Sequence, residues 1–148
     1  MDCEYGMIER VRRNDPCVTS LRCFDLNLQD LSFLEGNTYL TSLTLGNCEI
    51  TSISRLSHNT TIESLILINN YISDISPLCG NDILKHVNLS NNYIRDISAF
   101  KDNMSIVELD VSHNDIDDIS PLEGNDVCEV LRIGYTKIDD IWALRLNR

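Results

Sequence analysis

The chain has 148 residues, which is enough for one domain with an apolar core. Its formal net charge of −11 at pH 7 argues against nucleic acids and anionic membranes as partners, because both carry negative charge themselves. If charge selects a partner, that partner has a basic surface.

The beginning of the chain shows no signal for export or membrane insertion. Its residues MDCEYGMIERVRR are charged where a secretory signal would carry its hydrophobic segment. No apolar run approaches the roughly 18 residues that a membrane helix needs. We therefore expect a soluble protein located in the cytoplasm, or delivered into the interior of a host cell.

Residues 1–17 are expected to form an N-terminal cap. Three apolar residues recur there at helical spacing: Met7, Ile8 and Val11. The segment Asn14-Asp15-Pro16 ends the run, so residues 3–15 are predicted to form a capping helix.

Residues 18–148 consist of six repeats with a period of 22 residues, the last one truncated or closing the stack by itself. The repeats begin at Val18, Leu40, Ile62, Leu84, Ile106 and Cys128. Positions 1, 4, 6, 11, 14 and 17 are apolar in every repeat when cysteine is counted as apolar. Positions 4 to 6 alternate apolar, polar, apolar, which predicts a short half-buried strand. One unit cannot bury its own apolar edge, so the units are expected to stack.

Polar residues recur in the repeat as well. Asn70, Asn92 and Asn114 at position 9 are predicted to turn inward and bond backbone groups where the chain leaves the strand. The asparagines before them, at position 8, are expected to be exposed: Asn47, Asn69 and Asn91. Aspartates at position 13 are predicted to cap a 3₁₀ segment, and glycine-asparagine pairs near position 20 to form the return turn with positive φ.

The pattern LxLxxNxIxxIxxL, which begins with Leu65 in the third repeat, resembles the leucine-rich repeat family. The length of 22 residues and the phrase ISDISPL are similar to internalins and to the leucine-rich regulator of type-1 protein phosphatase. The resemblance implies an α/β fold: a right-handed solenoid with a parallel sheet on its concave face and short 3₁₀ or irregular arcs on its convex face. It also implies a non-catalytic module that binds a protein on the concave face.

Positions 3, 5, 7, 8 and 10 are expected to project from the concave side. The candidate binding residues at these positions are Phe24, Ile66, Ile68, Tyr71, Asn88, Tyr93, Asp110, His113 and Asp115. The apolar ones among them are informative because the repeat does not require apolar residues there. Two interpretations remain open, a contiguous binding patch with tyrosine anchors and ordinary exposed residues of a sheet.

Two further functions remain as alternatives. The C-terminal end of the stack could close on itself through Trp142, Leu144 and Leu146, giving a monomer, or it could join two copies with Trp142 buried between them. A cluster of His86, Glu108, Asp110 and His113 could bind a metal ion or be a solvated polar patch. No catalytic motif and no cofactor motif occurs, so an enzyme is not expected.

Most of the six cysteines fall inside the repeats at positions that differ from one another. This distribution favours reduced thiols over a disulfide framework. Cys3 and Cys17, in or beside the cap, are the pair for which a disulfide remains open.

Overall fold

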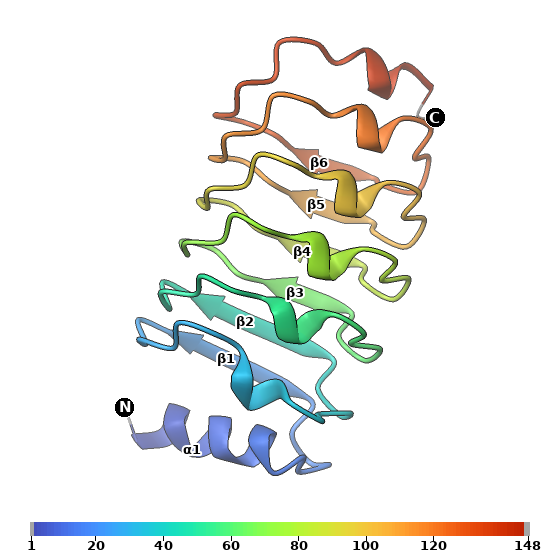
Figure 1. The fold of residues 1–148 in the computed structure, drawn as a ribbon. Coiled ribbons are helices and arrows are strands. Elements are labelled where there is room, and N and C mark those ends of the chain that lie inside the picture. The colour runs from blue at the N-terminus through green and yellow to red at the C-terminus, as the bar shows by residue number, and fades with distance from the viewer. Residues whose placement is uncertain (1, 147–148) are drawn as a thin grey trace.

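The computed structural model describes residues 2–146, with the side chains of residues 5–145. Within that range, helix α1 (Asp2–Arg12) precedes one sheet of six parallel strands (Figure 1). The strands are β1 (Ser20–Phe24), β2 (Ser42–Gly46), β3 (Ser64–Ile66), β4 (His86–Asn88), β5 (Glu108–Asp110) and β6 (Val130–Arg132). Each is followed by a 3₁₀ segment: η1 (Ser32–Leu34), η2 (Ser54–Leu56), η3 (Ser76–Leu78), η4 (Ser98–Phe100), η5 (Ser120–Leu122) and η6 (Trp142–Leu146).

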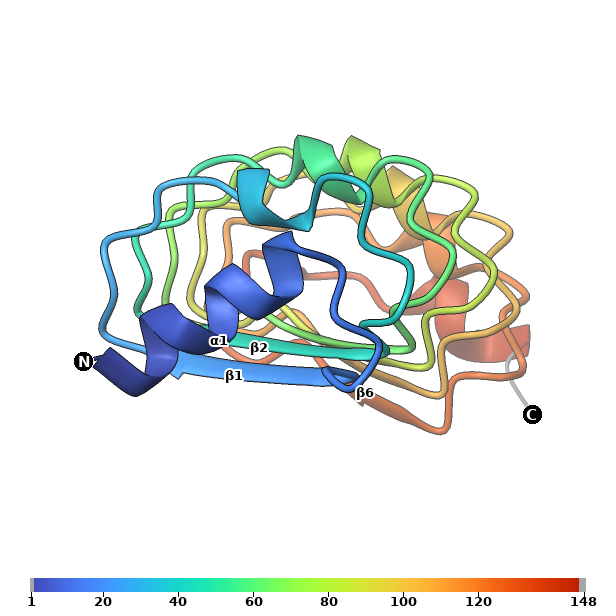
Figure 2. The same ribbon diagram turned by 90° about the horizontal axis from the view of Figure 1, so that it is seen from below.

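The strands pair in chain order, and each pair is offset by one repeat, as Leu43 with Leu65 and Leu65 with Val87. Seen along the stack, the sheet lies on one side of every coil and the 3₁₀ segments lie on the opposite side (Figure 2). The solenoid predicted from the repeat is confirmed, as is a helix at the N-terminal end. The division of the chain into cap and repeats at residue 17 remains a prediction.

The core is a set of apolar columns between the two layers. Equivalent positions of successive coils stack on one another, so Leu43 and Leu65 have no exposed surface. Helix α1 covers the first coil with Ile8 and Val11, which are buried as expected. Because every coil buries its edge against the next, the repeat pattern alone determines most of the core.

The last coil departs from this rule. Ile141, at a position that is buried in the coils before it, is 59% exposed, and Trp142 is 45% exposed. Closure of the stack through Trp142 therefore stays a prediction, as does the pairing of two copies. Ala143 and Leu144 do pack against the core, and the side chain of Leu146 lies outside the described residues.

The asparagines at position 9 form the predicted internal ladder. The carbonyl oxygen of Asn92 accepts the N–H of Ile72 at 3.0 Å, and its amide nitrogen donates to the carbonyls of Leu67 and Leu89 at 2.9 and 3.0 Å. Asn70 and Asn114 make equivalent bonds. Every coil of this ladder is thereby tied to its neighbours.

The asparagines at position 8 have a conformational role that the sequence analysis missed. Asn47, Asn69 and Asn91 have φ of 53, 53 and 55°, and the residues at the same place in later coils, His113 and Tyr135, have φ of 54 and 56°. This left-handed backbone lets the chain turn out of the strand, and asparagine tolerates it better than most residues.

A second asparagine ladder lies on the opposite flank, in return turns that have the predicted positive φ. Positive φ belongs to the residue before the asparagine, such as Gly80 with 70° or Asp102 with 60°, and not to the asparagine itself. Asn103 instead donates from its amide nitrogen to the carbonyl of Asn81 at 2.8 Å, one coil away, while its oxygen accepts the N–H of Ile106 at 3.0 Å.

Candidate protein-interaction surface

On the outward face of the sheet, the side chains of Phe24 and Ile68 lie against Gly46 across the first three coils. We call this apolar cluster the seat. Gly46 of β2 has no side chain, and the ring of Phe24 from β1 lies in the space this leaves. A Cβ atom on Gly46 would stand 2.5 Å from two ring carbons of Phe24 and 3.3 Å from Cγ1 of Ile68. The guanidinium carbon of Arg22 lies 5.1 Å from the centroid of the Phe24 ring. Phe24 and Ile68, predicted separately, therefore both lie against Gly46, a glycine that was not among the predicted site residues.

The middle of the same face is polar. Ile66 pairs in register with Asn88, and Asn88 with Asp110. The amide nitrogen of Asn88 lies 3.4 Å from Oδ2 of Asp110, while Oδ1 of Asp110 accepts bonds from the backbone and hydroxyl of Ser112 at 3.0 and 2.6 Å. Oδ1 of Asn88 accepts the equivalent bonds from Ser90 at 3.0 and 2.7 Å, so each of these two residues has one oxygen occupied by the serine two residues later.

A tyrosine pair lies where the chain leaves the strands. Tyr71 and Tyr93 are 52% and 57% exposed, and their rings stack with centroids 6.1 Å apart and planes 17° apart. Beside them is a shallow hollow of about 320 Å³, lined by the two tyrosines, by His113 and by both asparagine positions. The proximity of the two tyrosines follows directly from their shared position in the repeat.

Toward the C-terminal end, Asp115 is held by Lys137 at 2.8 Å and by Arg95 at 3.7 Å. Its hydrogen bond with the Lys137 ammonium, together with that charge, lowers the pKa of Asp115 below its ordinary value. His113 stacks on Tyr135 with ring centroids 4.3 Å apart. Tyr135 was not predicted, although its place in the repeat matches that of His113 and could have revealed it.

The proposed metal ligands form no compact site. Nδ1 of His86 lies 3.4 Å from Oε2 of Glu108. Among the residues that the structure describes, no three His, Cys, Asp or Glu side chains gather closely enough to hold a metal ion. The side chain of Cys3 lies outside the described residues, so its pairing with Cys17 stays a prediction.

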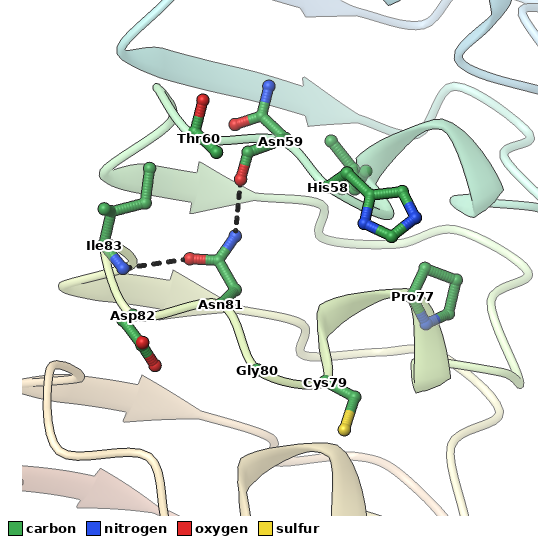
Figure 3. Close-up of a pocket in the computed structure, with 10 residues that line it drawn as sticks. His58, Asn59, Thr60, Pro77, Cys79, Gly80, Asn81, Asp82 and Ile83 are labelled. Atoms are coloured by element: carbon green, nitrogen blue, oxygen red, sulfur yellow. Dashed lines mark hydrogen bonds between the residues drawn. The ribbon is translucent and has the colours of Figure 1, made fainter.

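The flank where the return turns lie carries other hollows. One of about 330 Å³ is lined by residues such as His58, Pro77, Cys79 and Asn81 (Figure 3). Asn81 uses its amide for the backbone, donating to the carbonyl of Asn59 at 3.4 Å and accepting from the N–H of Ile83 at 3.1 Å. This hollow is a consequence of the turn geometry. In the described part of the chain, no helix has the length and apolar character to cross a membrane.

Comparison with known proteins gives a consistent family and fold. Two models described as leucine rich repeats match residues 36–53 and 60–116. No curated protein sequence gives a significant match.

Solved structures extend the comparison to most of the chain. An internalin (inlF) from Listeria monocytogenes is similar over 98% of this chain, with a TM-score of 0.87 and 23% identity, and the chain spans 46% of its length. An internalin C2 (inlC2) from the same species gives a TM-score of 0.71 with 24% identity, covering 87% of this chain and 67% of that one. Actin-binding site 2 of leiomodin-1 gives a TM-score of 0.57 with 24% identity over 78% and 81% of the two chains. At these identities the likeness concerns the fold.

Proposed function

We propose that this chain, which is a leucine-rich repeat protein, is a non-catalytic module that binds a protein partner on the outward face of its sheet. The binding surface comprises the seat of Phe24 and Ile68, the neighbouring Ile66, and the tyrosine pair. Asn88, Asp110, His113 and Asp115 form its polar border.

The observation that carries this proposal is the position of apolar side chains outside the core. The solenoid is held together by the inward residues of each coil, so the outward ones are free to vary without loss of the fold. Tyr71 and Tyr93 nevertheless expose about half of their surface beside each other. Exposed aromatic residues of this kind commonly dominate the affinity of protein interfaces.

The structural neighbours support the class of function. One of them is named as an actin-binding site of leiomodin-1, so this repeat architecture can present a protein-binding surface. The identity of the partner depends on side chains and not on the fold, so actin is not implied for this chain.

The test is the double variant Tyr71→Ala, Tyr93→Ala, assayed for capture of partners from the source organism and for its melting temperature. We expect the affinity for the captured partner to fall at least about 30-fold, as for a hot spot of roughly 2 kcal/mol, with little change in melting. Tyr39→Ala is the matched control, because Tyr39 is also exposed but precedes β2 on the other flank. Unchanged capture by the double variant would reject this surface.

A second candidate, association of two copies, is favoured by the exposed Ile141 and Trp142 of the last described coil. Burying both between two copies would remove apolar surface from water. Sedimentation over a concentration series should then show a dimer that Trp142→Ala dissociates, and a monomer at all concentrations would exclude it.

We also place the protein in the cytoplasm or in the interior of a host cell. The support is chemical: the cysteines inside the repeats stand at positions that differ from one another, which favours reduced thiols. Fractionation of cells expressing the full chain tests this location, and recovery of the protein only in the medium would contradict it.

A further inference from the structure

A row of asparagine side chains follows the ends of the strands. Asn69 and Asn91 occupy the same place in successive coils, and both are exposed with positive φ. Their side-chain amides make no hydrogen bond to any residue that the structure describes, whereas Asn47 at the same place donates to Oδ1 of Asp25 at 2.6 Å. Two outward amides one coil apart, each a donor and an acceptor, are therefore unoccupied.

The surroundings of these amides are both aromatic and acidic. The tyrosine pair lines the same hollow of about 320 Å³. Tyr71 and Tyr93 belong to a row formed by position 10 of successive repeats. The coil before Tyr71 has Glu49 in this row, and the coil after Tyr93 has Asp115. Asp115 is neutralised by Lys137 and Arg95, whereas Glu49 makes no ion pair within the described part of the chain. The carboxylate of Glu49, which does not itself line the hollow, thus stands one coil before Tyr71 in this row.

We propose that the amides of Asn69 and Asn91, the tyrosine pair and Glu49 together bind an extended peptide segment that carries lysine or arginine. This inference rests on the proposed function and specifies the kind of partner. The amides bond peptide backbone groups, an apolar peptide side chain packs against the tyrosines, and the basic side chain pairs with Glu49.

Three physical arguments lead to a peptide. A carboxamide offers the donor and acceptor that an extended backbone requires, so it binds main chain independently of sequence. Neighbouring coils of a sheet lie about 4.8 Å apart and an extended peptide advances about 3.3 Å per residue, so two amides reach groups one to two residues apart. The net charge of −11 attracts a basic segment.

The tyrosine stack leaves a sugar only the outer face of each ring. A pyranose ring needs an open aromatic face to stack on. Tyr71 and Tyr93 turn one face toward each other, with planes 17° apart. Their edges and hydroxyl groups are then the natural contacts for peptide side chains.

The experiment begins with selection from a random twelve-residue peptide library displayed on phage, using the full chain as bait. The most enriched peptide is then synthesised with a fluorescent label, and its affinity is measured by anisotropy. We expect enriched peptides to contain lysine or arginine next to an apolar residue. The double variant Asn69→Gly, Asn91→Gly should weaken peptide binding at least tenfold. Glycine keeps the positive φ at both positions and removes only the side-chain amides.

Asp102→Gly is the matched control. It also replaces an exposed residue with positive φ by glycine, but on the return-turn flank, and it should change the affinity less than twofold. Glu49→Gln should weaken binding and reduce its dependence on salt. Melting curves of all variants should stay within a few degrees of the parent.

Two results would overturn the inference: no peptide enriched over an unrelated bait, or equal affinity of the parent and the Asn69→Gly, Asn91→Gly variant. Either can occur while the tyrosine double variant still loses its natural partner. In that case the module binds a folded surface, and the proposed function stands without the peptide. If the tyrosine variant also keeps its partner, the proposed function fails as well.

Discussion

Adjacent asparagines in this chain have opposite roles. Asn92 is 6% exposed and bonds the backbone of neighbouring coils, while Asn91 is exposed and supplies a left-handed turn. The inward role of Asn92 could be predicted, because buried backbone N–H and C=O groups need hydrogen-bond partners where the chain leaves a strand. The left-handed turn at Asn91 could not be predicted, because the repeat period does not reveal the backbone φ angle.

Substituting the buried asparagine should be costly. Asn92→Ala removes the acceptor of the Ile72 N–H and the donor to the carbonyls of Leu67 and Leu89. With each unpaired buried group costing roughly 1–3 kcal/mol, we expect a loss of about 2–4 kcal/mol in the free energy of unfolding. Urea unfolding followed by circular dichroism measures it. Asn91→Gly should change stability by less than about 0.5 kcal/mol, and an equal loss in both variants would contradict the assigned roles.

The glycine seat gives a second prediction for a single residue. Gly46→Ala places a methyl group where the Phe24 ring lies, so the ring must move away from Gly46. We expect a loss of stability of about 1 kcal/mol, at the low end for overpacking because Phe24 is partly exposed, and a large shift of the Phe24 ring signals in NMR. Gly134→Ala is the control at the same position of the last coil, where no atom lies within 4 Å. Unmoved Phe24 signals would show that the glycine has no such role.

At the scale of elements, an aspartate two residues before most of the 3₁₀ segments accepts the first N–H of the segment. Oδ1 of Asp74 accepts the N–H of Ser76 at 2.9 Å, and Asp118 does the same for Ser120 at 2.7 Å. Hydrogen bonds from Ser76 lower the pKa of Asp74, and the backbone bond from Ser120 lowers that of Asp118. A carboxylate with a lowered pKa stabilises the fold above its unfolded pKa and loses that effect as the pH falls.

Asp74→Ala should therefore destabilise the protein in a way that depends on pH. We expect a loss of about 0.5–1 kcal/mol at pH 7, since the cap is exposed, and a difference from the parent that shrinks as the pH falls below the ordinary aspartate pKa of 3.8 toward the lowered pKa of the folded protein. Thermal melting from pH 7 to pH 3 measures this. Asp82→Ala, which removes an exposed carboxylate that caps no 3₁₀ segment, should have no effect, and a pH-independent loss in Asp74→Ala would contradict the capping role.

The elements show how far the sequence predicts this molecule. Strands, 3₁₀ segments and the internal asparagine ladder follow from the period, because each repeats in the same chemical surroundings. The period places His113 beside Tyr135, but it does not predict that their rings stack, nor that Phe24 lies over Gly46. Both depend on side-chain directions between neighbouring coils, where the repeated positions carry different residues.

For the whole molecule, the stack behaves as a row of units that contact only their neighbours. The sheet pairs each strand only with the strands before and after it in the chain. The free energy of the fold is then close to a sum over coils and their interfaces. Ile141 stands at a position that is buried in the coils before it, and it is exposed because the described last coil has a neighbour on one side alone.

This arrangement predicts a gradient in local stability along the chain. Leu65 in β3 is fully buried. Leu131, at the same position of the repeat in β6, is only half-buried. Amide hydrogen exchange read by mass spectrometry should be fastest in β6 and slowest in β2 and β3, because opening the terminal coil exposes the least apolar surface.

Two leucine substitutions separate local from global opening. Leu131→Ala should speed exchange in β5 and β6 and leave β1 and β2 unchanged. Leu43→Ala, in a fully buried column, should lower the free energy of global unfolding by about 3 kcal/mol, because it leaves a cavity between two coils. Equal exchange in all six strands of the described chain, or a global effect of Leu131→Ala, would mean that the coils unfold as one cooperative unit. The neighbour-only account of the stack would then be wrong.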